Sequence, residues 1–209
     1  NIQIIQKTKD KSKKYKMNLA NILTLLRIAA IPIVVICFYL PIEGARPIAG
    51  IVFGLAAFTD LLDGYIARNY DQSSRFGAFL DPVADKLMVA IVLVLLVQAD
   101  PGWYVDIIAI IIIGREIAVS ALREWMATIG ERKAIAVSMT GKVKTMLQMS
   151  GIGFMVYQEE VFGVNLYLIG FTFLLLAAVM TLWSMMMYLR LAWPSLKTSV
   201  EETEDQSES

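Results

Sequence analysis

The chain has 209 residues, a formal net charge of zero and 57% hydrophobic residues, more than a single soluble domain of this length needs. It contains no histidine and one cysteine, Cys37, which excludes a histidine general base, an intrachain disulfide and a thiolate zinc site. The apolar residues come in long blocks with few charges, which predicts an all-α membrane protein with several spans.

The two ends of the chain are polar and carry opposite charge. Residues 1–17 form a basic N-terminal arm with six lysines, which either is solvated or lies on anionic lipid headgroups. Residues 196–209 form an acidic tail that has nothing to bury, and we expect it to be disordered. The membrane-embedded domain is therefore predicted to cover residues 18–195.

Six transmembrane helices are predicted in this domain, because six apolar runs have roughly the 20 residues that a bilayer core requires. Their expected bounds are 20–40, 47–69, 79–98, 103–127, 139–157 and 163–191. With the N-terminus inside, the lysines and arginines between the spans gather on one side, and only Arg46 falls on the other. The positive-inside rule then places both termini in the cytoplasm.

Four aspartates lie where the second predicted helix ends and the third begins, on either side of a polar turn over residues 68–77. Asp60 and Asp63 are three residues apart, and Asp81 and Asp85 are four apart. Each pair therefore shares one face of a helix. Four like charges brought together repel each other strongly unless cations hold them. Carboxylates without nitrogen or sulfur ligands suit Mg²⁺ or Mn²⁺, although buried ion pairs between helices are the alternative interpretation.

The spacing of these residues resembles the signature of the CDP-alcohol phosphotransferases. In that signature two aspartates, a glycine and an Ala-Arg pair are followed by a second glycine and two more aspartates. It is met in full by Asp60, Asp63, Gly64, Ala67, Arg68, Gly77, Asp81 and Asp85. The resemblance implies a CDP-linked lipid donor, an alcohol that attacks its lipid-side phosphate, and CMP as the leaving group.

The resemblance also implies roles for the individual residues of the signature. Two divalent cations are expected, with Asp60, Asp63 and Asp81 as ligands. Asp85 is the expected general base, and it can also touch the second metal ion. The small residues of the signature are expected to let the cytidine and the diphosphate approach the backbone, and the arginine is expected to contact the diphosphate. These donor-binding residues are Gly64, Ala67, Gly77 and Arg68.

Two further polar clusters interrupt the predicted first and fifth helices. Asn21, Thr24 and Arg27 are spaced three apart on one face of the first helix, where they either bond to another helix or contact the substrate. Lys142 and Lys144 begin the fifth helix, where they either bind an anion or are ordinary interfacial lysines.

A third cluster lies in the predicted fourth helix. Arg115 and Arg123 are eight residues apart and share one side of that helix. Each has an adjacent glutamate, Glu116 or Glu124, but neighbouring residues point about 100° apart on a helix, so we expect poor pairing within the helix. Partners on other helices or a ligand anion are needed, and a ligand is the favoured interpretation.

Outside the signature, three segments resemble the bacterial phosphatidylglycerophosphate synthases of the same family: NILTLLR, GREIAVSALREWMA and TGKVKT. This resemblance covers residues 18 to about 150. It implies CDP-diacylglycerol as the donor, sn-glycerol 3-phosphate as the acceptor, a homodimer without a nucleic-acid partner, and a bacterial inner membrane with the active site facing the cytoplasm. A phosphorylated acceptor needs a cationic pocket. The residues that can supply it are Arg115, Arg123, Lys142 and Lys144.

Four other functions remain open. Within the family, phosphatidylglycerol as the acceptor would make a cardiolipin synthase, and inositol phosphate would make a phosphatidylinositol phosphate synthase. A cation transporter would need polar residues through the bilayer midplane, whereas the charges here gather at the predicted cytoplasmic side. A non-catalytic CDP-lipid-binding protein would be expected to lack the base, and Asp85 is present.

Overall fold

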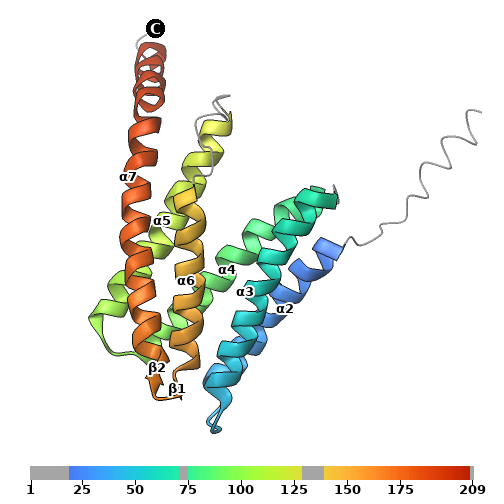
Figure 1. Ribbon diagram of the computed structural model, residues 1–209. Coiled ribbons are helices and arrows are strands. Elements are labelled where there is room, and N and C mark those ends of the chain that lie inside the picture. Colours follow the sequence, from blue (N-terminus) through green and yellow to red (C-terminus); the bar gives the residue numbers. More distant parts are fainter. Residues whose placement is uncertain (1–18, 71–74, 129–138, 208–209) are drawn as a thin grey trace, which may run out of the picture.

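The computed structural model is almost entirely helical, as predicted (Figure 1). It describes residues 19–70, 75–128 and 139–207; the basic arm over residues 1–17 lies outside these ranges. Within them, side chains are described for residues 22–60, 80–128, 141–190, 192 and 193. Six helices occur in the described part of the chain: α2 (Leu19–Tyr39), α3 (Ala45–Tyr70), α4 (Arg75–Ala99), α5 (Trp103–Thr128), α6 (Met139–Tyr157) and α7 (Leu166–Ser207).

The helices alternate in direction and fall into two groups. In Figure 1, α2 and α3 lie on one side with the start of α4, and α5, α6 and α7 lie on the other. The end of α3 and the start of α4 are therefore at the same end of the molecule as the end of α5 and the start of α6. Residues from both predicted polar regions thus share one end of the bundle.

Short turns connect the helices at the opposite end. Between α2 and α3, Gly44 has a φ of +83°, a conformation that glycine adopts without steric cost. Between α4 and α5, the backbone N–H of Gly102 donates to the side chain of Asp100 at 2.9 Å. Such Asx turns stabilise a tight change of direction.

The connection before α7 differs from the prediction that helix begins at residue 163. Two short antiparallel strands stand there, β1 (Glu160–Val161) and β2 (Val164–Asn165). The residues between them have positive φ, 53° at Phe162 and 75° at Gly163, which is the conformation of a two-residue hairpin turn and not of a helix. The helix starts only after Asn165, whose side chain accepts a hydrogen bond from the N–H of Leu168 and so caps it.

The far end of α7 also differs from the prediction. Disorder was expected over residues 196–209, but α7 continues to Ser207. Adding residues to an existing helix is much less costly than starting one, so a long apolar helix can extend into a polar segment. The polar turn predicted over residues 68–77 is likewise shorter, because α3 reaches Tyr70 and α4 begins at Arg75.

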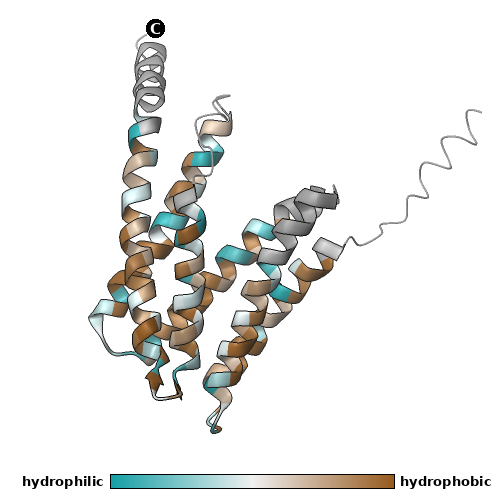
Figure 2. Ribbon diagram, viewed as in Figure 1, coloured by the Kyte–Doolittle hydropathy of each residue, from teal (hydrophilic) through white to brown (hydrophobic). Residues whose placement is uncertain are grey.

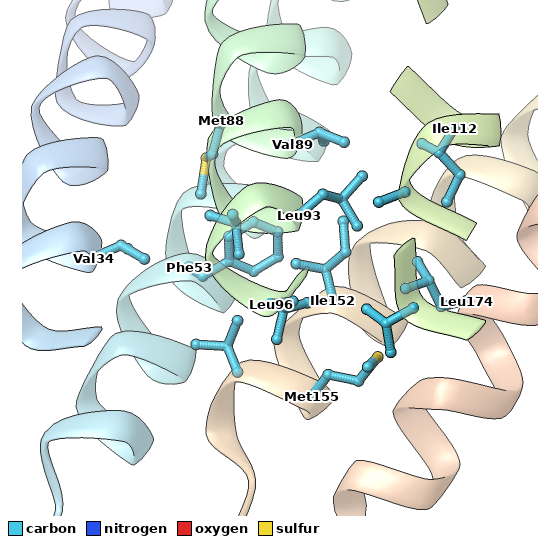
Figure 3. Packing of buried hydrophobic residues seen from close by; sticks show 14 of the residues in the cluster. Val34, Phe53, Met88, Val89, Leu93, Leu96, Ile112, Ile152, Met155 and Leu174 are labelled. Atoms are coloured by element: carbon cyan, nitrogen blue, oxygen red, sulfur yellow. The ribbon is translucent and has the colours of Figure 1, made fainter. Parts of the chain in front are cut away.

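The core lies where the two groups of helices meet (Figure 3). Phe53 of α3 and Leu93 of α4 are fully buried, and Ile152 of α6 and Leu174 of α7 pack into the same cluster. The α6–α7 contact depends on glycine: a Cβ atom at Gly151 would lie 2.9 Å from the carbonyl oxygen of the glycine at 170. This close approach fixes the two helices that carry part of the candidate site.

The middle parts of the helices are mainly hydrophobic, and hydrophilic residues lie toward the two ends of the bundle (Figure 2). Leu55 is 61% exposed and Ile110 is 70% exposed, as expected for side chains that face lipid and not water. Two described segments, Ile22–Tyr39 and Leu166–Arg190, are long and apolar enough to cross a membrane. These features suggest a membrane protein.

Candidate active site

A cluster of three aspartates surrounds Arg27 of α2. The guanidinium Nη1 donates to Asp85 Oδ1 at 2.6 Å, and Nη2 lies 3.0 Å from Asp60 Oδ1. Asp81 Oδ1 is 3.9 Å from Nη1. The side chain of Arg27 is only 1% exposed, whereas those of the three aspartates are 26–38% exposed. The arginine thus forms the floor of a carboxylate cluster that remains open on its other side.

The polar face predicted on the first helix contributes to this cluster. Thr24, one turn before Arg27, donates a hydrogen bond to Asp81 Oδ1 at 2.5 Å. Of the two interpretations left open, bonding between helices is therefore confirmed for Thr24 and Arg27. Asn21, the third residue of the face, has a side chain outside the described residues.

Asp60, Asp81 and Asp85 come together as predicted, although they belong to two helices and are up to 25 residues apart. The role of Arg27 in pairing with them was missed, since only Lys86 and Arg68 are close to them in sequence. The sequence feature that could have indicated this role was the i, i+3 spacing of Thr24 and Arg27, which puts both side chains on one face of a helix. Several predicted residues of the signature have side chains outside the described part: Asp63, Gly64, Ala67, Arg68 and Gly77.

The chemistry of the carboxylate cluster fits a hard divalent cation. Its donors are carboxylate oxygens, which Mg²⁺ and Mn²⁺ prefer, and their exposure provides an entry path. Among the described side chains, however, no group of three acidic residues is arranged as a ready metal site. The guanidinium of Arg27 lies between Asp60 and Asp85. The metal site therefore stays a prediction.

A second cluster of charges lies between α5, α6 and α7. Arg115 donates to Ser184 Oγ of α7 at 2.9 Å and to Glu116 Oε2 at 3.3 Å. Lys144 of α6, which is buried, lies 3.9 Å from the same glutamate oxygen. The expected partner on another helix is thus present, since the bond of Arg115 to Ser184 is shorter than its contact with the adjacent Glu116.

The four cations predicted to bind the acceptor differ in their direct contacts. Arg115 and Lys144 share Glu116. Arg123 is exposed and donates to the hydroxyl of Tyr188 at 2.8 Å. Lys142, two residues before Lys144, is also exposed and lines a cavity beside α3. Residues two apart on a helix point to nearly opposite sides, so this separation follows from the helix itself.

That cavity is a groove of about 1020 Å³ between α3 and α6. Its walls are mainly apolar: Ile51, Phe58, Met146, Met149 and Phe154 contribute to them. At one end lie Asp60, Lys142 and Thr145, and the other end is lined by Tyr157 and Leu166. The groove therefore leads from Asp60 of the carboxylate cluster along α3 and α6.

Comparison with known proteins relates this arrangement to one family. The family model for CDP-alcohol phosphatidyltransferases matches residues 17–189. Three similar proteins are named CDP-diacylglycerol–glycerol-3-phosphate 3-phosphatidyltransferase. The one from Yersinia pestis (strain Pestoides F) is 47% identical over 87% of this chain and 98% of its own length. For Pseudomonas fluorescens the identity is 50%, over 87% and 93%. For Haemophilus influenzae it is 47%, over 89% and 99%.

Proposed function

Because this chain belongs to the CDP-alcohol phosphatidyltransferase family, we propose that it transfers the phosphatidyl group of CDP-diacylglycerol to sn-glycerol 3-phosphate. The products are phosphatidylglycerophosphate and CMP. The observation that carries the proposal is the meeting of three signature aspartates from α3 and α4 around one point. Relatives that bear this activity in their names match the chain over nearly their whole length.

The reaction exchanges one phosphate ester for another. An acceptor hydroxyl oxygen attacks the phosphorus that bears the diacylglycerol, and the bond from that phosphorus to the CMP oxygen breaks. CMP leaves with the electron pair of that bond, and Asp85 takes the hydroxyl proton as the general base. Asp85 suits this role because its side chain is partly exposed within the cluster, where an acceptor can reach it.

Two Mg²⁺ or Mn²⁺ ions, when bound, supply positive charge that neutralises the diphosphate and stabilises the leaving CMP. The proposed ligands are Asp60, Asp63, Asp81 and Asp85, with Asp85 touching one ion in addition to its role as base. In this proposal Arg68 contacts the diphosphate. The backbone at Gly64, Ala67 and Gly77 borders the cytidine and the diphosphate.

The groove between α3 and α6 provides a place for the acyl chains of the donor. It begins at Asp60 and runs back along α3 to Gly50, ten residues or about 15 Å of helix. That is about half the thickness of a bilayer core, the depth that one leaflet's acyl chains occupy. A lipid in the groove would have its headgroup beside Asp60 and Lys142.

Arg115 and Lys144 are proposed to bind the acceptor phosphate, with Arg123 and Lys142 at the edge of the site. A buried lysine and a largely buried arginine that share a single carboxylate have capacity for a further anion. Arginine and lysine both form charge-assisted hydrogen bonds with phosphate, and arginine can do so through two parallel bonds.

The proposed setting is a bacterial inner membrane with both termini and the active site on the cytoplasmic side. The distribution of lysine and arginine between the helices supports this orientation. CDP-diacylglycerol and membrane lipids are then partners within the bilayer, and glycerol 3-phosphate arrives from water. A homodimer is proposed from the family resemblance alone.

The test is CMP release by the purified chain in lipid nanodiscs that contain CDP-diacylglycerol and Mg²⁺. Four reactions are compared: no acceptor, glycerol 3-phosphate, phosphatidylglycerol and inositol phosphate. We expect release only with glycerol 3-phosphate. Release with phosphatidylglycerol or inositol phosphate instead would assign a different acceptor, and no release with any acceptor would contradict the transferase.

A further inference from the structure

Arg27 is the only charged residue in α2, and it is directed at the carboxylate cluster. The rest of α2 is apolar apart from Asn21 and Thr24. An arginine inside an apolar membrane helix is costly without partners of opposite charge. Here two aspartates from different helices are within 3.0 Å of its guanidinium, and a third is within 4.0 Å. Arg27 thus supplies positive charge where the aspartates would otherwise repel each other.

The oxygens that Arg27 contacts belong to the proposed metal ligands. Nη1 bonds to Oδ1 of Asp85 and Nη2 faces Oδ1 of Asp60, so the two ends of one guanidinium link α4 to α3. A divalent cation bound to these carboxylates would lie close to the guanidinium, and the two positive groups would repel each other. The arginine and a metal ion are therefore alternatives for the same negative charge.

We infer that Arg27 is a positioning residue that holds the aspartates together before metal ions bind, and that it competes with those ions for the same carboxylate oxygens. This inference rests on the proposed function, because it assumes that the aspartates bind metal. In this role Arg27 keeps the cluster assembled when metal is absent, and it weakens metal binding by occupying ligand oxygens.

A purely supporting role for Arg27 predicts the opposite effect on metal affinity. If the arginine only braces the aspartates in the geometry that the metal needs, its removal should disorder the ligands and weaken binding. If it competes, its removal frees oxygens and also takes away a nearby positive charge, so binding should strengthen. The sign of the change in affinity separates the two roles, and a general loss of stability does not imitate the strengthening.

The experiment titrates the full purified chain with Mn²⁺, without substrates, and follows free Mn²⁺ by electron paramagnetic resonance. Melting temperature is measured in chelator and in saturating Mg²⁺. The variants are Arg27→Gln and Arg27→Lys. The matched control is Arg46→Gln, which removes a half-buried arginine at the other end of α3, where it contacts the Phe38 ring and a backbone carbonyl.

We expect Arg27→Gln to bind Mn²⁺ about tenfold more tightly than the wild type, which corresponds to about 1.4 kcal/mol. Its melting temperature should fall in chelator and recover in Mg²⁺ by more than the wild type gains. Arg27→Lys, which keeps the charge but has only one donor group, should bind with intermediate affinity. Arg46→Gln should bind Mn²⁺ like the wild type.

Unchanged or weaker Mn²⁺ binding by folded Arg27→Gln would overturn the inference and leave the proposed function intact. Should that variant not fold in chelator, Arg27→Lys decides: affinity at or below the wild-type value rejects competition. A wild-type chain that binds no Mn²⁺ would reject both the inference and the metal-dependent mechanism.

Discussion

The two charged clusters of this protein have opposite signs and different degrees of internal pairing. In the carboxylate cluster, three aspartates surround one arginine, with contacts of 2.6 and 3.0 Å that join three helices. In the cationic cluster, Arg115 and Lys144 share Glu116 at the longer distances of 3.3 and 3.9 Å. Each cluster thus contains one residue of the charge that its proposed ligand would bring.

The difference in contact distance affects how readily each cluster would bind its proposed ligand. Arg27 is held by short contacts and is almost fully buried, so a metal ion has to compete with a well-made pair. The contacts within the cationic cluster are longer. Arg115 Nε is buried without a hydrogen-bond partner among the described residues, as are Gln148 Oε1, four residues after Lys144 on α6, and Thr181 Oγ1, three residues before Ser184 on α7. Unpaired buried polar atoms are costly, and a bound phosphate ester or water would satisfy them.

The largest expected effect comes from metal removal, which tests the carboxylate cluster alone. Excess chelator should abolish CMP release, and added Mg²⁺ or Mn²⁺ should restore it, because without the ions the negatively charged aspartates would repel the negatively charged diphosphate. The chain should stay folded in chelator, since Arg27 still pairs with the aspartates. Activity and melting temperature are measured on the same samples. Full turnover in chelator would exclude metal dependence.

The second largest effect is expected for Asp85→Asn. Loss of a general base typically costs about 10²- to 10⁴-fold in rate, so kcat should fall by that factor while the donor still binds. Asp60→Asn, which removes a proposed metal ligand only, should weaken donor binding as well. Steady-state kinetics and binding of CDP-diacylglycerol distinguish the two variants.

Asp100→Asn serves as the control for these substitutions. Asp100 lies in the turn between α4 and α5, at the opposite end of the bundle, where it accepts hydrogen bonds from Gly102 and Tyr167. It should retain near-normal kcat even where stability falls. If Asp85→Asn kept the wild-type kcat, Asp85 would not be the base; if it lost donor binding as severely as Asp60→Asn, it would be chiefly a metal ligand.

The carboxylate cluster was largely predictable because its information is local in sequence. Residue spacing placed Asp81 with Asp85, and both lie near Arg27; the apolar runs gave the number of helices in the described part. The partnership of Arg27 with these residues was not predictable. It depends on how α2 packs against α3 and α4, and Arg27 is 58 residues from Asp85.

The cationic cluster was predicted less well for the same reason. Ser184 was not identified, because a single serine in an apolar helix gives no signal until α5 and α7 are placed side by side. Lys142 and Lys144 were assigned to one pocket, although a separation of two residues on a helix directs them to different sides. The β1–β2 hairpin was missed because the apolar run of α7 seemed to begin before the turn at Gly163.

The third prediction concerns acceptor binding by Arg115. Arg115→Gln should raise KM for glycerol 3-phosphate by about 10- to 100-fold, the equivalent of about 1.5–3 kcal/mol for a charge-assisted contact. KM for CDP-diacylglycerol should change little. Arg115→Lys should restore only part of the affinity, since lysine lacks the planar pair of donors.

Ser184→Ala is the matched control, because it removes the partner of Arg115 on α7 without removing the positive charge. Its effect on KM for the acceptor should be much smaller. An Arg115→Gln variant that melts early but keeps its acceptor KM would mean that the arginine serves only to join α5 to α7.

The smallest expected effects separate Lys144 from Lys142. Lys144 is buried beside Glu116, whereas Lys142 is exposed at the mouth of the groove with Asp60. Lys144→Met should therefore raise KM for glycerol 3-phosphate by about five- to tenfold, or about 1–1.4 kcal/mol, and leave KM for the donor unchanged. Lys142→Met should raise KM for CDP-diacylglycerol by about two- to fivefold, the scale of an exposed charge pair, with no effect on the acceptor. Steady-state kinetics with each substrate varied in turn measure both. Equal effects of the two substitutions on the acceptor KM would mean that both lysines bind the acceptor. Only a shared ligand could couple side chains that point to different sides of α6.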